Sequence, residues 1–412
     1  MIMTSRERVT AAVDHREPDQ VPIDFGGHRS SGIMALGYKK LREYLGLPKK
    51  PIKIYDMIQQ LAVVDNDVLD RFGVDTIEMG RGFALDDKDW KEWTMPDGTE
   101  VLIPSYVDVE KKDGSWVLKA PSGIDSGVQR EGMIYFDQIY WPYKDGVPEE
   151  FSGINEALAD VMWSVPSPPN LEKTSAEEAA AGAKKLREST DRYIVFLFGG
   201  NLLEISSFLC SIPEFMMLMA AEPDKTHKLL DALVEIHKKN IDTFVPAVAP
   251  YIDNILFGDD LGMQSGPQIS PDMYREYFKP RHEELWKYAK KVSGKTVQLH
   301  SCGGLRPLLN DLIDAGLDAV NPVQISSAGM DAAELKQEFG DRLCLWGGGC
   351  DTQHVLPNGT PEEVRSHVLK QCEILQPGGG FVFQQVHNIM ANVPPENIVT
   401  MFDAVAEFNG KK

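Results

Sequence analysis

Three side chains suited to holding a soft metal ion stand in glycine-rich segments of this chain. His300 and Cys302 lie two positions apart in the segment HSCGG, and Cys350 follows a run of three glycines. In an extended backbone, residues i and i+2 project to the same side, so His300 and Cys302 can bind one ion together. An imidazole and two thiolates form a typical zinc set, and three protein ligands leave a fourth position for water or substrate. The spacing therefore predicts a catalytic zinc site; the alternative is a histidine beside two unconnected core cysteines.

Polar side chains at the ends of other predicted strands are candidates for proton transfer and substrate contact. Asp260 is a candidate general acid or a partner that orients His300. His387 can bind substrate or a water on the metal, or it can be a buried core histidine. Four further residues are candidate substrate contacts: His28, Glu204, Asn321 and Gln324. A fourth metal ligand is left open between the amide of Gln324 and the carboxylates of Glu204 and Asp260.

Eight short β-rich runs are expected to position these residues. They cover residues 21–27, 75–80, 193–200, 254–260, 296–303, 318–324, 343–349 and 381–388. Amphipathic helices are expected between most of them, most clearly over 270–292, 306–316 and 361–375. Eight strands alternating with helices predict a closed (β/α)8 TIM-type barrel of the α/β class, and no GxGxxG pattern follows the first run to favour an open doubly wound sheet. The active site of such a barrel lies at the carboxyl ends of its strands, where the polar residues named above fall.

Residues 81–150 break the alternation of strands and helices. They contain short β-rich runs joined by Asp-Gly dipeptides at 97–98 and 113–114, which favour tight hairpin turns. We therefore expect residues 1–412 to form a single barrel domain, with 81–150 as a small β-hairpin insertion after the second strand, over the active face. The insertion either decorates the barrel or serves as a lid or a docking surface.

The composition disfavours several classes of function. Lys and Arg number 42 and Asp and Glu 62, so the net charge is −20, which disfavours binding to nucleic acid or to an anionic membrane. No apolar run approaches the length of a membrane span, and the charged start lacks the apolar core of a signal peptide, so we expect a cytoplasmic protein. Five cysteines in a long chain without a secretion signal argue against a disulfide framework. A homodimer is compatible with these features, although none of them specifies one.

A family resemblance is carried by three segments, HSCGGL, WGGGCDTQHVLPNGTPEEV and GGGFVFQQVHNIMANVPPENIVTMFDAV. Together they resemble the uroporphyrinogen decarboxylase superfamily, and within it they look like the zinc-dependent, corrinoid-linked methyltransferase branch. In that branch the histidine and cysteine of an HxC motif and a later cysteine ligate zinc, which matches His300, Cys302 and Cys350. Some relatives have a glutamate where Gln324 stands, so the resemblance leaves the fourth ligand open. The decarboxylase itself needs no metal, and its RQAGRY pattern is replaced here by GGHRSSGI.

The resemblance implies methyl transfer with zinc and cobalamin as cofactors. Because the chain lacks the DxHxxG pattern of corrinoid-binding modules, the cobalamin would arrive on a separate corrinoid protein. We favour transfer from a small-molecule methyl ether, a methoxylated aromatic above all, to cobalt(I), with zinc as a Lewis acid on the ether oxygen; the chain would then be the methyltransferase of an O-demethylase. The alternative is transfer from methylcobalamin to a thiol that zinc activates. Tetrapyrrole decarboxylation is a lesser alternative, and a zinc-stabilised binding barrel without enzymatic activity is the last.

Overall fold

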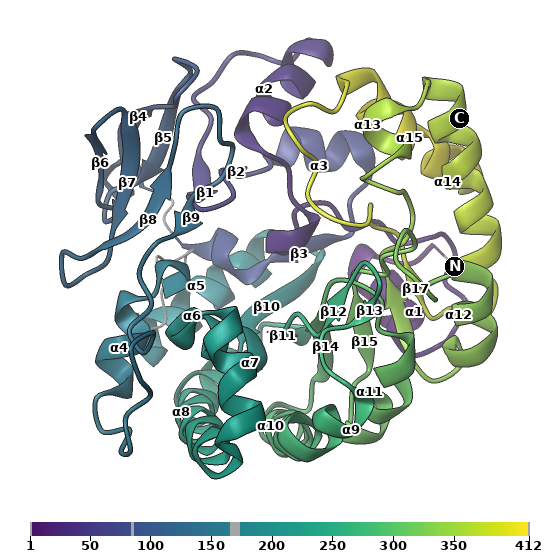
Figure 1. The fold of residues 1–412 in the computed structure, drawn as a ribbon. Helices are drawn as coiled ribbons and strands as arrows, with labels where there is room; N and C mark the ends of the chain where they lie inside the picture. The colour runs from purple at the N-terminus through teal and green to yellow at the C-terminus, as the bar shows by residue number, and fades with distance from the viewer. Residues whose placement is uncertain (1, 84–85, 165–173, 411–412) are drawn as a thin grey trace.

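A curved sheet of parallel strands forms the centre of the molecule (Figure 1). The computed structural model describes residues 2–83, 86–164 and 174–410. The strands of this sheet are β3 (Thr76–Glu78), β10 (Tyr193–Gly199), β11 (Asn254–Gly258), β14 (Thr296–His300), β15 (Ala319–Asn321), β16 (Cys344–Trp346) and β17 (Phe381–Val382). They are hydrogen-bonded in the order β17-β16-β15-β14-β11-β10-β3, so strands that follow one another in this sheet are also neighbours in space.

The segment around Ile23 closes this sheet into a barrel. Ile23 forms a parallel bridge with Phe383, and the next amide donates to the Phe383 carbonyl at 2.8 Å. On the other side, the Asp75 amide donates to the Ile23 carbonyl at 2.8 Å, which joins the segment to β3. The prediction of an α/β TIM-type barrel is confirmed. The predicted first strand, 21–27, is reduced to this one bridge, because the backbone turns at Gly26 with a φ of 71°.

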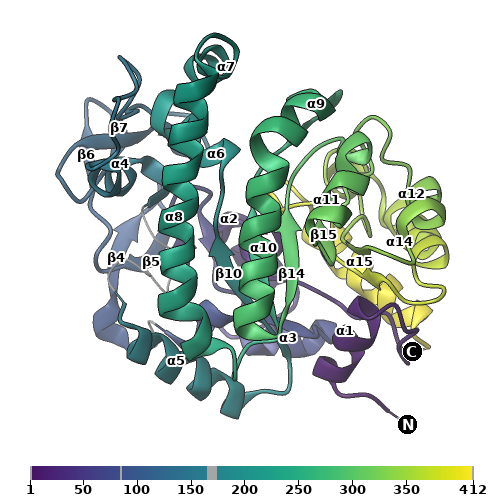
Figure 2. The same cartoon turned by 90° about the horizontal axis from the view of Figure 1, so that it is seen from below.

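Helices cover the outside of the barrel and connect its strands; α8 and α10 stand side by side in front of β10 and β14 (Figure 2). Their bounds are α2 (Ala35–Tyr44), α3 (Asn66–Phe72), α4 (Ile154–Asp160), α5 (Ala176–Ser189), α6 (Leu203–Cys210), α7 (Ile212–Ala221), α8 (Pro223–Val248), α9 (Pro271–Met273), α10 (Lys279–Ser293), α11 (Leu309–Ala315), α12 (Ala332–Phe339), α13 (Val355–Asn358), α14 (Pro361–Leu375) and α15 (Pro395–Phe408). The predicted helix 361–375 coincides with α14, which a capping box at Thr360 begins. The predicted helix 270–292 is divided by a π-helical turn, Tyr274–Phe278.

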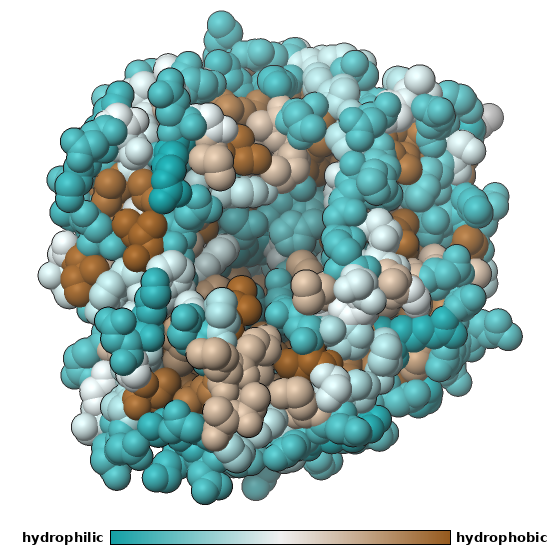
Figure 3. Space-filling model, viewed as in Figure 1, coloured by the Kyte–Doolittle hydropathy of each residue, from teal (hydrophilic) through white to brown (hydrophobic). Residues whose placement is uncertain are grey.

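The two ends of the barrel differ. Helix α1 (Ser5–Val13) covers the amino-terminal end, where Val9, Ala12 and Val13 join the apolar cluster inside the barrel. The opposite face, at the carboxyl ends of the strands, is hollowed at its centre; hydrophilic residues line the hollow, and apolar patches border it above and below in the view of Figure 3. The polar residues that follow the strands therefore lie at the open end.

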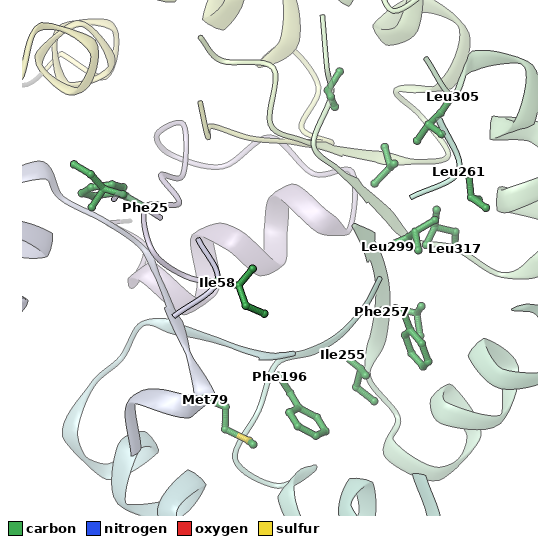
Figure 4. Packing of buried hydrophobic residues seen from close by; sticks show 14 of the residues in the cluster. Phe25, Ile58, Met79, Phe196, Ile255, Phe257, Leu261, Leu299, Leu305 and Leu317 are labelled. Carbon is green, nitrogen blue, oxygen red and sulfur yellow. The ribbon is translucent and has the colours of Figure 1, made fainter. Parts of the chain in front are cut away.

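Alternation along the strands divides the buried residues into two layers. Tyr193 and Val195 of β10 pack inside the barrel together with Trp346. Ile194 and Phe196 face outward into the larger cluster between sheet and helices, part of which Figure 4 shows. Successive side chains of a strand point to opposite faces, so a strand that is buried on both faces is apolar at nearly every position. This continuous apolar run is the feature of the sequence that predicts β10.

Antiparallel strands occupy the stretch between β3 and β10, to one side of the barrel (Figure 1). Their bounds are β4 (Trp90–Thr94), β5 (Glu100–Pro104), β6 (Val109–Lys112), β7 (Ser115–Lys119), β8 (Asp125–Gln129) and β9 (Asp137–Gln138). β4 pairs with β5, and β6 to β9 form a four-stranded sheet. The turn between β6 and β7 has φ of 49° at Asp113 and 81° at Gly114, the left-handed pair that a two-residue hairpin requires. Two smaller pairs are β1 (Ile54–Asp56) with β2 (Leu61–Ala62), and β12 (Gly262–Met263) with β13 (Gly266–Pro267).

Within the described residues, no single helix combines the length and the apolar character of a membrane span. In the same part of the chain, α6 and α7 taken as a pair reach that length and composition, but they are bent by 108° relative to each other. The bend falls at Ser211, whose φ is 77°.

Candidate metal centre

His300 ends strand β14, and its imidazole faces Cys302. The Nε2 atom of His300 lies 3.5 Å from the Sγ atom of Cys302. One ligand atom from each of His300, Cys302 and His387 lies within 4.8 Å of the others. We call these three residues the His-Cys-His cluster. The structure thus brings together two of the three predicted zinc ligands and adds His387, which follows β17.

Cys350 lies at the same end of the barrel but outside the His-Cys-His cluster. It follows β16, is fully buried, and forms a parallel bridge with Gln385. Its sulfur lies 3.9 Å from the carbonyl oxygen of Asp351. Cys350 follows β16, and its bridge partner Gln385 follows β17 and precedes His387 by two residues. Cys350 and His387 therefore lie just beyond the ends of two neighbouring strands. The third ligand position therefore has two candidates.

Asn321 contacts the imidazole nitrogen of His300 that points away from Cys302. Its Oδ1 atom lies 2.8 Å from Nδ1 of His300. Its amide nitrogen donates to the Trp346 carbonyl at 3.0 Å and to Oε1 of Gln384 at 2.6 Å. Asn321 is fully buried, and its side chain orients a cluster residue; its contact with substrate stays a prediction.

His28 also lies beneath the cluster. It is fully buried, with Nε2 at 3.1 Å from Oε1 of Gln384 and 3.2 Å from Oδ2 of Asp24. Its Nδ1 accepts a hydrogen bond from the Ser30 amide at 3.2 Å. In this structure both ring nitrogens of His28 therefore contact other residues of the chain, and its contact with substrate stays a prediction. The hydroxyl of Ser30, which sequence reasoning missed, lies 3.2 Å from Nε2 of His300.

Asp260 borders the cluster. Its Oδ1 accepts a hydrogen bond from the Cys302 amide at 2.7 Å and lies 3.8 Å from Nε2 of His300. Its side chain is 32% exposed, so it reaches the open mouth of the barrel. Glu204, nearby, accepts a hydrogen bond from Asn201 at 2.6 Å. Burial, together with the charges of the two neighbouring aspartates, raises the pKa of Glu204 well above its ordinary value.

Asp259, the other member of the Asp-Asp pair, is a structural residue. Its carboxylate accepts hydrogen bonds from the backbone amides of three residues at the start of α6: Leu202 at 3.2 Å, Leu203 at 3.0 Å and Glu204 at 2.9 Å. Nε2 of His282 lies 3.2 Å from the same carboxylate, which is fully buried. Asp260 is thus the member of the pair that reaches the mouth.

Gln324 holds the loop that follows Cys302. Its Oε1 accepts a hydrogen bond from the Gly303 amide at 2.8 Å, and the residue is only 7% exposed. Gly303 has a φ of 90°, and a Cβ atom there would come within 2.3 Å of the carbonyl carbon of Gly262. The Gln324 side chain is a predicted contact for a metal or a substrate. In this structure its amide oxygen holds the loop at Gly303.

Burial keeps the cluster uncharged. Burial raises the pKa of the Cys302 thiol well above its ordinary value, and the nearby carboxylates raise it further. Burial lowers the pKa of His300, and it lowers that of His387 to about 3. Both imidazoles are therefore neutral at physiological pH and keep a lone pair, whereas binding of a divalent cation would displace the proton of the thiol.

Comparison with known proteins identifies the family of this barrel. The model of the family described as uroporphyrinogen decarboxylase (URO-D) matches residues 145–408, which is more than half of the chain. This chain belongs to the uroporphyrinogen decarboxylase family. The matched region runs to the end of α15 and contains the three cluster residues.

Two curated relatives illustrate the range of this family. A uroporphyrinogen decarboxylase of Chlorobaculum tepidum is 28% identical over 197 residues, which are 47% of this chain and 52% of that protein. A methylated-thiol–coenzyme M methyltransferase of Methanosarcina mazei is 27% identical over 244 residues, 58% of this chain and 59% of that protein. The chain thus spans a little over half the length of these two relatives. A solved methyltransferase from Methanosarcina mazei shares the fold, with a TM-score of 0.58 at 18% identity over 98% of this chain and 99% of that one.

The donor atoms of this member of the uroporphyrinogen decarboxylase family fit zinc. Nitrogen and sulfur donors are the ligands that zinc prefers, and two imidazoles and a thiol lie within 4.8 Å of one another. The carboxylate of Asp260, 3.8 Å from Nε2 of His300, offers an oxygen beside them. Because catalytic zinc sites use three protein ligands and one open position, the set is sufficient for such a site.

Proposed function

We propose that this protein is a zinc-dependent methyltransferase that moves a methyl group from a methyl ether to the cobalt(I) of a corrinoid protein. A methoxylated aromatic is the favoured methyl donor. The observation that carries the proposal is the 3.5 Å approach of His300 Nε2 to Cys302 Sγ at the barrel mouth. Similarity to the Methanosarcina mazei methylated-thiol–coenzyme M methyltransferase supports methyl transfer as the class of reaction.

His300 and Cys302 would hold the zinc ion with a third ligand, for which we propose Cys350. A second thiolate would neutralise the charge of a divalent ion in this buried site. His387 is the alternative third ligand, because its imidazole lies in the cluster. When bound, zinc supplies Lewis acidity toward the oxygen of the methyl ether.

Asp260 is the proposed proton donor to the leaving oxygen. When the bond between the methyl carbon and the oxygen breaks, the oxygen keeps an electron pair and takes up a proton at neutral pH. Asp260 is placed for this step because it borders the cluster and reaches solvent. Glu204, a carboxyl whose pKa is raised by burial and by Asp260 and Asp259, is proposed to contact the substrate. With Cys350 as the third ligand, the neutral imidazole of His387 is left to contact substrate.

A separate corrinoid protein would dock on the carboxyl face of the barrel. This face is hollowed at its centre (Figure 3), and we propose that a cofactor carried by the partner enters this hollow. The antiparallel strands between β3 and β10 stand beside it and offer further contact surface (Figure 1). The net charge of −20 would complement a basic patch on the carrier and speed its association.

A thiol acceptor is the second candidate, in which methylcobalamin donates the methyl group. It is favoured by the Methanosarcina mazei relative, which is named for methylated thiols and aligns with 58% of this chain. The same proposed zinc ligands would also suit methyl transfer from methylcobalamin to a thiol, because a metal bound to thiolates lowers the proton affinity of an incoming thiol.

The decisive experiment uses the full chain loaded with zinc. Incubation with a cobalt(I) corrinoid protein and a methoxyphenol should produce the absorbance of methylcobalamin and an equal amount of catechol. Cys302→Ala should abolish both products, whereas Cys372→Ala, a buried cysteine of α14, is the matched control and should leave them unchanged. Consumption of methylcobalamin by a thiol, without turnover of the ether, would favour the second candidate. Metal-independent decarboxylation of uroporphyrinogen would overturn both.

A further inference from the structure

A cavity of about 400 Å³ lies where the β4–β5 hairpin meets the barrel. The Leu102 amide of β5 donates to the Ile52 carbonyl at 2.8 Å, which attaches the hairpin to the chain just before β1. Lys53, Trp90 and Leu102 line the cavity from this side, and Glu78 and Arg81 line it from the barrel side. None of the three cluster residues lines it. The volume is within the range of small-molecule sites.

Two charged side chains in this cavity have unused hydrogen-bonding capacity. The Arg81 guanidinium donates from Nη1 to the Val64 carbonyl at 2.6 Å, and it pairs with no carboxylate among the described residues. Glu78 is only 6% exposed, and its carboxyl has no hydrogen-bond partner within the described chain. A guanidinium offers five donors in a planar fork, so most of the donors of Arg81 remain available for a ligand.

The remaining wall combines a cation with apolar surface. Nζ of Lys53 lies 4.9 Å from the centre of the Trp90 ring. Lys50 pairs with Asp65 at 2.9 Å, whereas Lys53 and Arg81 form no ion pair with any residue that the structure describes. Asp87 is a further carboxylate in the lining. Phe83, Trp90 and Leu102 offer apolar contacts for a flat body between the charged groups.

We propose that this cavity is a second ligand site that binds a small aromatic carboxylate bearing a ring hydroxyl. The carboxylate would bind the fork of Arg81 and the ammonium of Lys53. The ring would lie against Trp90, and the hydroxyl would bond to Glu78. A planar carboxylate is the partner that an arginine fork matches best, and the aromatic wall selects a flat ring over an aliphatic chain. This inference does not rest on the proposed methyl transfer.

Titration calorimetry with 4-hydroxybenzoate tests the site in the full chain, with and without zinc. We expect one saturable site, and binding at least about tenfold weaker in Arg81→Gln, because the ligand loses a charged, bidentate partner. Lys53→Met should weaken binding about threefold, because the carboxylate loses the ammonium group. This second variant tests the site even if Arg81→Gln does not fold. The matched control is Arg130→Gln, an exposed arginine paired with Asp137, which should bind as the parent does.

Ligand variants test the chemistry of the same site. Benzoate, which lacks the hydroxyl, should bind several-fold more weakly than 4-hydroxybenzoate, and phenol, which lacks the carboxylate, at least about tenfold more weakly. Equal affinity in Arg81→Gln, Lys53→Met and the parent would overturn the proposal, as would the absence of saturable binding. Binding that requires zinc, or that Cys302→Ala removes, would place the ligand in the metal centre and would also overturn it.

Discussion

His300 and Asn321 share a hydrogen bond of 2.8 Å between Nδ1 and Oδ1 that fixes which imidazole nitrogen faces the metal centre. The amide nitrogen of Asn321 is committed to two acceptors, the Trp346 carbonyl and Oε1 of Gln384. Its oxygen must therefore accept, and Nδ1 of His300 must carry the proton. Nε2 keeps its lone pair and points toward Cys302, as a zinc ligand requires.

Asn321→Ala is expected to weaken zinc binding by about 10- to 100-fold, because the imidazole loses its fixed tautomer and orientation. Competition with a chromogenic chelator at pH 7 measures the effect. The matched control is Asn397→Ala, a buried asparagine that bonds to the Leu356 and Gly359 carbonyls away from the cluster. Equal zinc affinity in Asn321→Ala and this control would contradict the assigned role.

A pair of variants tests the proposed third zinc ligand. Metal analysis should give about one zinc per chain, lost in Cys350→Ala and retained in His387→Ala, because two thiolates neutralise the ion and one does not. Cys302→Ala should lose zinc on either assignment. Cys344→Ala, a buried cysteine of β16 with no place in either ligand set, should keep it. The reverse result, with zinc lost in His387→Ala and retained in Cys350→Ala, would make His387 the third ligand and exclude Cys350 from the ligand set.

Glu78 should make the protein less stable as the pH rises. Burial, more than any neighbouring charge, raises the pKa of Glu78 from an ordinary value of 4.5 to about 7. Between these values the folded chain holds a proton that the unfolded chain has released, so stability falls as the pH rises from 4.5 to 7. The loss is complete above pH 7 and amounts to about 3 kcal/mol.

Glu78→Gln removes this titration while keeping the size of the side chain. The urea midpoints of the variant and the parent should therefore agree near pH 4.5 and diverge up to pH 8, with the variant the more stable. Glu276→Gln, a change of an exposed glutamate in the π-helical turn, controls for loss of charge alone. A difference between variant and parent that does not change with pH would show that Glu78 does not titrate in this range.

The barrel could be predicted because its strands are continuous apolar runs and its helices have clear boundaries. β10 alternates inward and outward apolar residues, and α14 starts with Thr360 and Pro361 where the sequence signals a start. The first strand is shorter than predicted because the backbone turns at Gly26, and the apolar run before it does not signal that turn. The sequence also does not show why residue 27 is a glycine: a Cβ there would come within 2.3 Å of the Thr76 hydroxyl. That contact joins residues from separate strands.

The candidate site could be predicted only where chemistry follows from local spacing. His300 and Cys302 meet because residues two apart in a strand share a face. The contacts of Asn321 and His28 with Gln384 could not be predicted, because they join residues far apart in the sequence. His387 joins the cluster from beyond β17, where no regular strand fixes the direction of a side chain.

Asp259→Asn is expected to destabilise the fold without changing zinc content. The carboxylate of Asp259 accepts three backbone amides at the start of α6, and an asparagine turns an NH2 group toward donors that are buried. Leaving such donors unsatisfied costs about 2–3 kcal/mol, measured as a shift of the urea midpoint. Asp260→Asn, one residue further on and partly exposed, is the matched control: it should change stability by less than about 1 kcal/mol and reduce methyl transfer. If both variants lost the same stability, or if Asp259→Asn were as stable as the parent, Asp259 would not be the residue that holds α6 at the mouth of the barrel.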